Sequence, residues 1–515
     1  MSFTGMTSAD PPSRPFSRRR FLGGAAAGTA TFAFPWLRSD GSAAQATPVA
    51  ETSESAWYEL ANRLDGRLLR DGDPMYAAAT EINATRFAAV RPAGIAVCAM
   101  PRDAATCVTW AKETGTPFAV RSGGHSYAGF STSPGLVINV RSLQGAQVNP
   151  AEGTVTVAAG VNNADFADAV DPYGVYVPGG RCPTVGLSGL TLGGGWGFSC
   201  RHLGMTCDSL VSTDIALASG EIVTASETDN ADLFWALRGA AGGNFGVNTS
   251  FTYRFVPTRD VTFFEATWSG GDTAAVVAAL MRMQQDAPQE LGLRLAVRSQ
   301  SRTPRTVPAP FTVDVIGLHW GAAEVVRELV DRVQEVQPAS TLAIETMSFS
   351  AARARLAATT PTGTYQIKTG FVRGTFSSEA LVTMLEGMAA MPGVASRAQE
   401  STVGIYCWGG KVNEVAPDAT AFVHRNADFL YKSEVLWEAT DHPDLIVENL
   451  DWIEAFHASM QPYLSGGAYQ NFVDRSQENW AEAYYGENLS RLVELKRKWD
   501  PDNLFRFQQS IPLSL

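Results

Sequence analysis

Two segments of this chain each place one reactive side chain inside a frame of glycines. The first is residues 121–129 (RSGGHSYAG), which carries His125, and the second is residues 179–197 (GGRCPTVGLSGLTLGGGWG), which carries Cys182. Consecutive glycines let backbone N–H groups come close to an anion, because no Cβ atom stands in the way. A histidine and a cysteine held in this way predict two covalent tethers to one flat cofactor, in preference to a metal site or a nucleophile–base pair.

The first residues resemble an export signal. Residues 17–22 (SRRRFL) are typical of a twin-arginine signal, a weakly apolar stretch follows at 23–37, and 44–46 (AQA) offers a cleavage site. The stretch is too short and too mild to anchor the protein in a membrane. We therefore expect residues 1–46 to direct a folded, cofactor-loaded protein out of the cytoplasm; the alternative is a disordered arginine-bearing tail.

Composition bounds the size and the partners of the protein. The 515 residues are enough for two to four core-sized units. A formal net charge of −12 leaves no basic surplus to neutralise phosphates, which argues against a nucleic-acid partner. We expect the partners to be a small-molecule substrate and O2.

Cysteine and histidine spacing argues against a bound metal. No CxxC, HxxxH or HExxH pattern occurs, so no zinc site is expected. With Cys182 assigned to the cofactor, Cys200 and Cys207 could close a small disulfide-bonded loop in an oxidising exterior, or remain two buried thiols.

Residues 47–257 have an α/β pattern. We expect two small α/β lobes that clasp a ligand; a single doubly wound sheet is disfavoured because no GxGxxG follows the first strand. Helices are predicted at 55–69 and at 101–114, the latter starting near Asp103. Strands are predicted at 87–90, 94–100, 118–120, 136–140, 154–158, 215–217 and 222–224.

The composition shifts near residues 256–257. Residues 258–460 are predicted to form an α+β domain on an antiparallel sheet, followed by a C-terminal segment, 461–515. The predicted strands are 263–268, 291–297, 311–318 and 365–371, and the predicted helices are 274–285, 322–334 and, in the last segment, 488–499.

The two glycine loops suit a flavin. Strand 118–120 leads into backbone donors at Ser122–Ser126 that would cradle a pyrophosphate, with His125 projecting toward the ring. A neutral imidazole nitrogen can attack the 8-methyl group of an isoalloxazine, and the soft Cys182 thiolate suits ring carbon C6. A lone loop histidine is more often a hydrogen-bonding residue, and a lone cysteine a buried small hydrophobe. In order, inside intact glycine frames, the two together indicate a flavin.

Four motifs resemble those of the berberine-bridge-enzyme-like branch of the vanillyl-alcohol oxidase and p-cresol methylhydroxylase superfamily. They are the two glycine loops, DLFWALRG at 232–239 with GGNFG at 242–246, and DPDNLFRFQQSIP at 500–512. The resemblance implies an α+β fold: a two-lobed PCMH-type FAD-binding domain, then an α+β substrate domain with an antiparallel sheet. It also implies a C-terminal segment that packs back on the FAD domain, and FAD bound covalently through both His125 and Cys182.

The glycine loops and the resemblance together provide a set of candidate cofactor-binding residues. They are Arg121, Ser122, Gly123, Gly124, His125, Ser126, Cys182, Gly186, Gly189, Gly193, Gly194, Gly195, Val223 and Asn471.

Two residues are candidates for the catalytic base that removes the substrate's proton while flavin N5 accepts a hydride. Tyr469, in GGAYQNF at 466–472, resembles the family's tyrosine-x-asparagine motif and is the leading candidate, with Asn471 positioning the site; the alternative is a core tyrosine in a strand. A tyrosine pKa near 10 requires neighbours that favour tyrosinate. Glu434 is the second candidate. Alternation on a strand at 429–437 places it on the same face as Lys432, so an exposed ion pair with Lys432 explains this residue at least as well as a catalytic role does.

Two further positions bear on the reaction. Trp196 stands where the plant members of the family usually carry a second tyrosine that supports the base, and Val185 is the small residue that the family associates with oxygen access. The resemblance therefore favours an oxidase that releases hydrogen peroxide over a dehydrogenase. The expected reaction is oxidation of an alcohol, with a carbohydrate C1 hydroxyl as the leading substrate. The alternatives are a secondary-metabolite alcohol or amine, and a flavin-bearing protein that sequesters a toxic compound.

Overall fold

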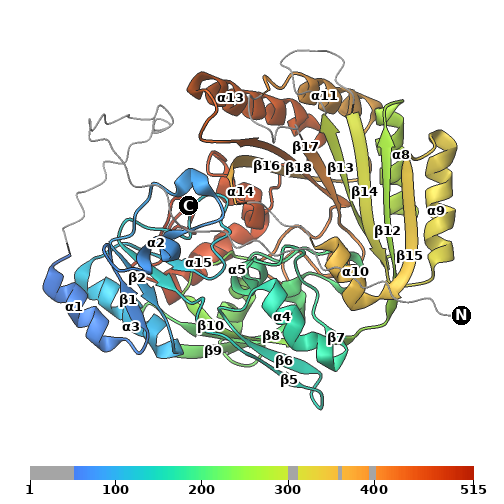
Figure 1. Cartoon of the computed structure of the whole chain (residues 1–515). Coiled ribbons are helices and arrows are strands. Elements are labelled where there is room, and N and C mark those ends of the chain that lie inside the picture. Colours follow the sequence, from blue (N-terminus) through green and yellow to red (C-terminus); the bar gives the residue numbers. More distant parts are fainter. Residues whose placement is uncertain (1–51, 300–310, 358–361, 394–401) are drawn as a thin grey trace, which may run out of the picture. The chain divides into compact units, whose positions relative to one another are not determined.

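The described part of the chain is organised around three main β-sheets (Figure 1). This computed structural model describes residues 52–299, 311–357, 362–393 and 402–515. The predicted export signal, residues 1–46, lies outside them. Among the described residues no helix combines the length and the apolar character needed to cross a membrane.

The first sheet is small and leads into the first glycine loop. Its strands lie in the order β1-β2-β4-β3, with β2, β3 and β4 parallel and β1 antiparallel. The apolar runs of β2 and β4 are largely buried, as expected for parallel strands covered on both faces. The strands are β1 (Arg67–Leu69), β2 (Gly94–Val97), β3 (Phe118–Arg121) and β4 (Leu136–Asn139).

The second sheet is antiparallel and completes a two-lobed unit with the first. Its strands have the order β5-β6-β10-β8-β9. A two-stranded ribbon pairs β7 (Val175–Tyr176) with β11 (Val256–Pro257). The five strands are β5 (Ala146–Asn149), β6 (Thr154–Ala158), β8 (Leu210–Ala216), β9 (Ile222–Ser226) and β10 (Val247–Arg254).

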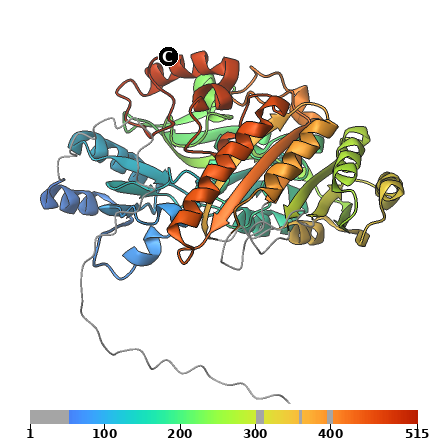
Figure 2. The ribbon, with the colours of Figure 1, turned by 90° about the horizontal axis from the view of Figure 1, so that it is seen from above.

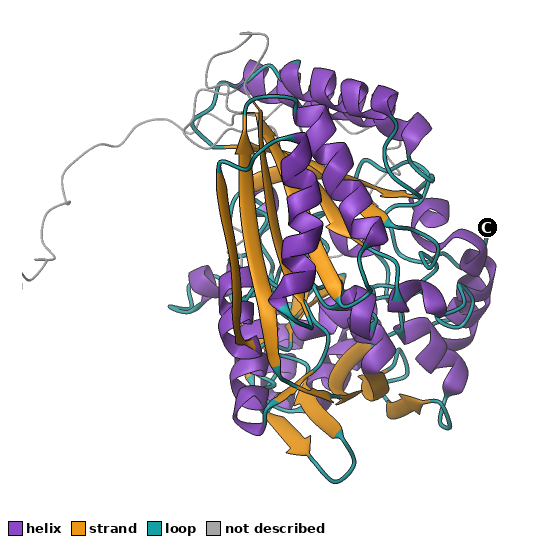
Figure 3. Cartoon of the chain, turned by 90° about the vertical axis from the view of Figure 1, so that its right-hand side faces the viewer, coloured by secondary structure: helices purple, strands orange, loops and turns teal. Residues whose placement is uncertain are grey.

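The third sheet has seven antiparallel strands in the order β15-β12-β14-β13-β17-β18-β16. Helices cover one face of it, as Figure 3 shows, and α13 runs along this layer in Figure 2. We call the opposite face the inner face. The strands are β12 (Asp260–Ser269), β13 (Leu291–Ser299), β14 (Phe311–His319), β15 (Thr341–Ser348), β16 (Thr364–Val372), β17 (Thr402–Cys407) and β18 (Phe429–Trp437).

One group of helices covers the outer face of the seven-stranded sheet. Those that cover the seven-stranded sheet are α8 (Thr273–Asp286), α9 (Ala323–Val336), α11 (Ser378–Ala389) and α13 (Pro443–Met460). A further helix, α10 (Phe349–Leu356), packs against β12, β14 and β15 of the same sheet. The others are α1 (Glu54–Arg63), α2 (Tyr76–Thr80), α3 (Pro101–Thr114), α4 (Asn163–Val170), α5 (Leu187–Leu192), α6 (Cys200–Leu203), α7 (Ala231–Leu237), α12 (Lys411–Glu414), α14 (Trp480–Tyr485) and α15 (Leu489–Trp499).

The predicted α+β class is confirmed, and most predicted elements are present with shifts of one or two residues at their ends. Two predictions near the start are wrong. The helix predicted over 55–69 ends at Arg63, because the N–H groups of Asp65 and Gly66 donate to the buried carboxylate of Asp103, and β1 follows. Residues 87–90 form no strand, since local bonds such as Val90 N–H to the Phe87 carbonyl satisfy the backbone instead.

The last helix is tied to the chain around it by one buried cation. Lys496 on α15 donates to the carboxylate of Asp500 (2.7 Å) and to the carbonyls of Asn244 (2.7 Å) and Phe505 (2.6 Å). Both members of the ion pair are 0% exposed, and burial lowers the pKa of Lys496. The same carboxylate accepts the backbone N–H groups of Leu504 and Phe505, so it holds the final extended segment.

We expect Lys496→Met to lower the free energy of unfolding by about 3–5 kcal/mol, because it leaves the Asp500 carboxylate buried without its cation. The matched change Lys498→Met removes an exposed pair with Asp232 and should cost less than about 1 kcal/mol. Urea denaturation followed by tryptophan fluorescence measures both. Equal effects of the two changes would contradict the role assigned to the buried pair.

Candidate active site

The two glycine loops touch backbone to backbone. A Cβ atom added to Gly123 would lie 2.3 Å from the Gly186 nitrogen, and one added to Gly186 would lie 2.5 Å from the Gly123 nitrogen. Any side chain at either position would force the loops apart. This contact brings His125 and Cys182, 57 positions apart in the sequence, to the same cavity.

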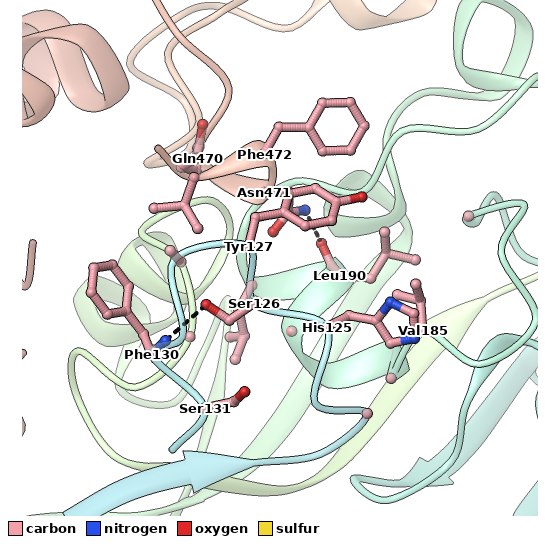
Figure 4. A pocket seen from close by; sticks show the side chains of 18 of the residues that line it. His125, Ser126, Tyr127, Phe130, Ser131, Val185, Leu190, Gln470, Asn471 and Phe472 are labelled. Carbon is pink, nitrogen blue, oxygen red and sulfur yellow. Dashed lines mark hydrogen bonds between the residues drawn. The ribbon is translucent and has the colours of Figure 1, made fainter. Parts of the chain in front are cut away.

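Three hydrogen bonds fix the loops relative to each other and to the second lobe. The Ser122 hydroxyl donates to the Ala159 carbonyl (2.8 Å), and the Asn163 amide donates to the Cys182 carbonyl (3.0 Å). His125 Nε2 lies 2.9 Å from the Thr184 hydroxyl. Figure 4 shows His125 beside the loop that carries Val185.

The loops form one wall of a cavity of about 410 Å³, a size typical of small-molecule sites (roughly 300–1,000 Å³). The inner face of the seven-stranded sheet forms another wall. The C-terminal segment, which carries Gln470, Asn471 and Phe472, closes a third side (Figure 4). Among the residues that line the cavity are Ser122, His125, Cys182, Val185, Trp196, Arg294, Tyr365, Tyr406, Lys432, Glu434, Tyr469, Asn471 and Phe472.

His125 has the electronic state that a tether requires. Burial lowers its pKa to about 4, so the imidazole is neutral at neutral pH. Its Nδ1 atom is buried and has no hydrogen-bond partner among the described residues, while Nε2 faces Thr184. A neutral ring with an unpaired nitrogen at a cavity wall fits covalent attachment to a flavin, and the glycine cradle fits its phosphates.

Most of the predicted cofactor residues, all of which are described, lie at this cavity. Arg121 and residues 193–195 lie behind it and support it. Arg121 donates to the carbonyls of Ser131 (2.8 Å) and Ala79 (2.6 Å), which braces the first loop. Val223 lies on β9, the edge strand of the five-stranded sheet, apart from the cavity lining. The predicted residues that line the cavity are Ser122, Gly123, Gly124, His125, Ser126, Cys182, Gly186, Gly189 and Asn471.

Residues 193–195 are glycines for reasons of packing. A Cβ on Gly193 would lie 2.1 Å from the Asn471 side-chain oxygen, and one on Gly195 would lie 2.3 Å from the Thr206 hydroxyl. The close approach lets this turn reach the C-terminal segment. It thereby places the N–H groups of Gly195 and Trp196 at the hydroxyl of Tyr469.

Three donors converge on the Tyr469 oxygen. The N–H groups of Gly195 and Trp196 and the amide of Asn471 each lie 3.1 Å from it. The second Asn471 N–H donates to the Leu190 carbonyl (2.8 Å), which fixes the amide orientation. Burial (1% exposed) raises the pKa of Tyr469 overall, and the three donors reduce that rise without reversing it. Three donors on one phenol oxygen match the acceptor capacity of a phenolate better than that of a phenol.

Glu434 and Lys432 form the ion pair that strand alternation predicts, with a contact of 2.5 Å. The expected exposure is wrong, because the pair lies on the inner face at the cavity and Lys432 is 7% exposed. Burial raises the pKa of Glu434, but the charges of Lys432 and Arg294 outweigh this and lower it below its ordinary value. The carboxylate is therefore ionised and already paired.

Sequence reasoning missed Tyr406 and Arg294. Tyr406 on β17 is packed edge-on against Trp196 (ring centroids 4.9 Å apart) and lies directly opposite Arg294 on β13. Burial raises the pKa of Tyr406, but Lys432 and Arg294 outweigh it and lower it overall. Alternation on the predicted strand 291–297 could have marked Arg294 as a charge amid apolar residues, but nothing in the sequence places β17 beside that strand.

The disulfide alternative is wrong, and the buried-thiol alternative is confirmed. None of the six cysteines, all of which are described, forms a disulfide. The Cys200 thiol lies 3.7 Å from the Cys407 carbonyl, and the Cys207 thiol lies 3.6 Å from the Asp208 carboxylate. The described residues also contain no group of three or more histidine, cysteine or acidic side chains that could hold a metal.

Comparisons with known proteins agree with this geometry. Residues 92–226 match the family model described as FAD binding domain, and residues 468–512 match the model described as berberine and berberine like. The chain is 32% identical over 462 residues to the FAD-linked oxidoreductase YgaK of Bacillus subtilis, covering 87% of this chain and 97% of that protein. It is 29% identical to the xylooligosaccharide oxidase of Thermothelomyces thermophilus, covering 82% and 87%. The structure of Physcomitrella patens BBE-like 1 superposes with a TM-score of 0.78 at 26% identity, covering 89% and 99%.

We expect Gly123→Ala to cut the flavin content of the purified protein about tenfold, because the added methyl group meets the Gly186 backbone and overpacking costs at least ~1–3 kcal/mol. Gly179→Ala is the matched control in the second loop, where the nearest atom to the new Cβ is 3.6 Å away. The flavin-to-protein absorbance ratio measures both. A normal ratio in Gly123→Ala would contradict the close contact of the loops.

Proposed function

The chain belongs to the berberine bridge enzyme-like family of FAD-linked oxidoreductases and is an FAD-dependent oxidase, and we propose that its FAD is attached through both His125 and Cys182. The observation that carries the proposal is the meeting of the two loops at Gly123 and Gly186. It places an unpaired imidazole nitrogen and a thiol on one cavity wall. Bound FAD would supply a two-electron acceptor at this wall, and with O2 as the final acceptor the by-product would be hydrogen peroxide.

The hydrogen bonds of His125 select the atom that forms the tether. Nε2 is engaged by Thr184 at 2.9 Å, which leaves Nδ1 as the ring nitrogen without a partner and makes it the proposed point of attachment. The low pKa keeps this lone pair free of a proton across the physiological range. Cys182 lines the same cavity next to Arg181. The hydrogen bond from the Asn163 amide to the Cys182 carbonyl holds this turn in place.

Tyr469 is the proposed base. Its oxygen is held by the three donors from Gly195, Trp196 and Asn471, which stabilise the phenolate that takes the proton of the substrate hydroxyl. Asn471 positions this oxygen. Glu434 is the weaker candidate, since its charge is engaged by Lys432.

The proposed substrate is an alcohol, with a carbohydrate C1 hydroxyl converted to a lactone. Similar proteins named xylooligosaccharide oxidase, chitooligosaccharide oxidase and carbohydrate oxidase support this choice. A cofactor held by two bonds needs little clamping by the protein, which leaves space for a bulky donor. Val185 lines the cavity as a small side chain and supports access of O2. The proposed site of action is outside the cytoplasm, after export through the signal in residues 1–46.

Acid-precipitated protein should remain yellow, because two covalent bonds survive unfolding. His125→Ala and Cys182→Ala should each keep the colour through the remaining bond, and the double variant should lose it. Cys98→Ala, a buried cysteine outside the cavity, is the control and should behave as the unchanged protein. A colourless pellet from the unchanged protein would exclude covalent attachment.

Tyr469→Phe should slow flavin reduction by about 100-fold, within the range for loss of a general base. Because the pKa of Tyr469 is raised, the unchanged enzyme should reduce faster as pH rises into the alkaline range, and the variant should lose this dependence. Tyr431→Phe is the control, since Tyr431 is equally buried but packs under the helices of the seven-stranded sheet. Anaerobic stopped-flow absorbance measures the rate of flavin reduction. An unchanged rate in Tyr469→Phe would show that Tyr469 is not the general base.

A further inference from the structure

The side chains that line the cavity carry more positive than negative charge. Among the described residues that line the cavity, the cations are Arg181, Arg294 and Lys432, and Glu434 is the one carboxylate. We call the three cations the basic wall. The excess is unexpected in a chain whose formal net charge is −12.

Strand register places two of the cations around one aromatic ring. Arg294 on β13 lies directly opposite Tyr406 on β17, and Lys432 on β18 lies directly opposite Gly404, two residues before Tyr406. Positions two apart share a face, so all four face the cavity. A Cβ on Gly404 would lie 2.9 Å from the Tyr406 ring, so the ring lies over Gly404, between the two cations.

The charges of the basic wall are not balanced by the protein. Lys432 is paired with Glu434 at 2.5 Å. Arg294 and Arg181 form no ion pair with a carboxylate of the described residues, and the buried Nε of Arg294 has no hydrogen-bond partner there. By contrast, Arg298, four residues along the same strand, is paired with Asp314. Arg181 and Arg294 are half-buried, and a half-buried guanidinium group without a carboxylate partner is stabilised when an anion joins it.

An ionised Tyr406 balances only part of the excess positive charge of the basic wall. The cations lower its pKa, which favours its phenolate, and the Arg294 guanidinium lies 5.4 Å from its ring centroid. With both Tyr406 and Glu434 ionised, three cations still face two anions. One cation of the basic wall therefore remains for a ligand.

We propose that the basic wall binds a carboxylate group of the substrate, so that the enzyme acts on alcohols that carry a carboxylate. Arginine suits this role because its planar fork meets a carboxylate with two parallel hydrogen bonds. Arg294 lines the cavity from the seven-stranded sheet, a different wall from the glycine loops that carry His125 and Cys182, and so can hold a part of the substrate other than the reacting carbon. The inference rests on the proposed oxidase function and adds the charge of its substrate.

Matched substrates that differ only in charge test the proposal. We expect kcat/KM for 4-(hydroxymethyl)benzoate and for glucuronate to exceed that for the methyl ester of the former and for glucose by at least about tenfold, the range of one charged hydrogen bond. Arg294→Gln should raise KM for the charged substrates at least tenfold and leave the neutral ones nearly unchanged, and Arg294→Lys should restore part of the difference. Arg298→Gln, a paired arginine on the same face, is the control.

Binding of 4-methylbenzoate, which has no alcohol to oxidise, separates this inference from the proposed function. Calorimetry should show binding to the unchanged holoenzyme, weaker binding to Arg294→Gln, and no comparable binding of methyl 4-methylbenzoate. Such a result supports the basic wall even if no tested alcohol reduces the flavin. Equal use of charged and neutral alcohols overturns the inference but leaves the oxidase standing. Equal slowing of all substrates by Arg294→Gln overturns it too, because the arginine would then serve the flavin.

Discussion

The contact between Gly123 and Gly186 is the constraint on which the active site depends. Two backbones approach so closely that neither position can carry a Cβ, and this approach joins the loop after β3 of the first sheet to a loop between β6 and β8 of the second sheet. His125 and Cys182 reach one cavity for this reason alone. The bonds of Ser122 and Asn163 to the second lobe then hold the arrangement in place.

The C-terminal segment joins the cofactor loops to the seven-stranded sheet. The Tyr469 N–H donates to the Thr369 hydroxyl on β16 (3.1 Å), the Tyr469 oxygen accepts from the second glycine loop, and Gln470 donates to the Gly239 carbonyl (2.7 Å). Lys496 and Asp500 anchor the end of the same segment. The proposed base thus belongs to the piece of chain that holds the two halves of the cavity together, which couples its position to the stability of the fold.

Local sequence patterns correctly predicted the elements in which the spacing of apolar residues reports which face is buried. The strands at 154–158 and 429–437 are present with the predicted bounds, because alternation reports which face is buried. The predicted strand at 87–90 failed because its backbone groups bond to near neighbours in the chain. The glycine loops were predictable because glycine is required there by close packing. Val223 lies away from the cavity, on an edge strand that no local signal distinguished.

By itself the sequence determined the chemistry available: a histidine and a cysteine in glycine frames, a tyrosine-x-asparagine pair and the α+β class. The tertiary structure alone decided which groups act on one another. The three donors at Tyr469 come from two distant segments, and the register of β13, β17 and β18 brings two of the three cations of the basic wall together, while Arg181 comes from the second glycine loop. Strand pairing joins residues more than a hundred positions apart, and the charge of a buried site is the sum over all its walls, so neither is encoded in any single stretch of chain.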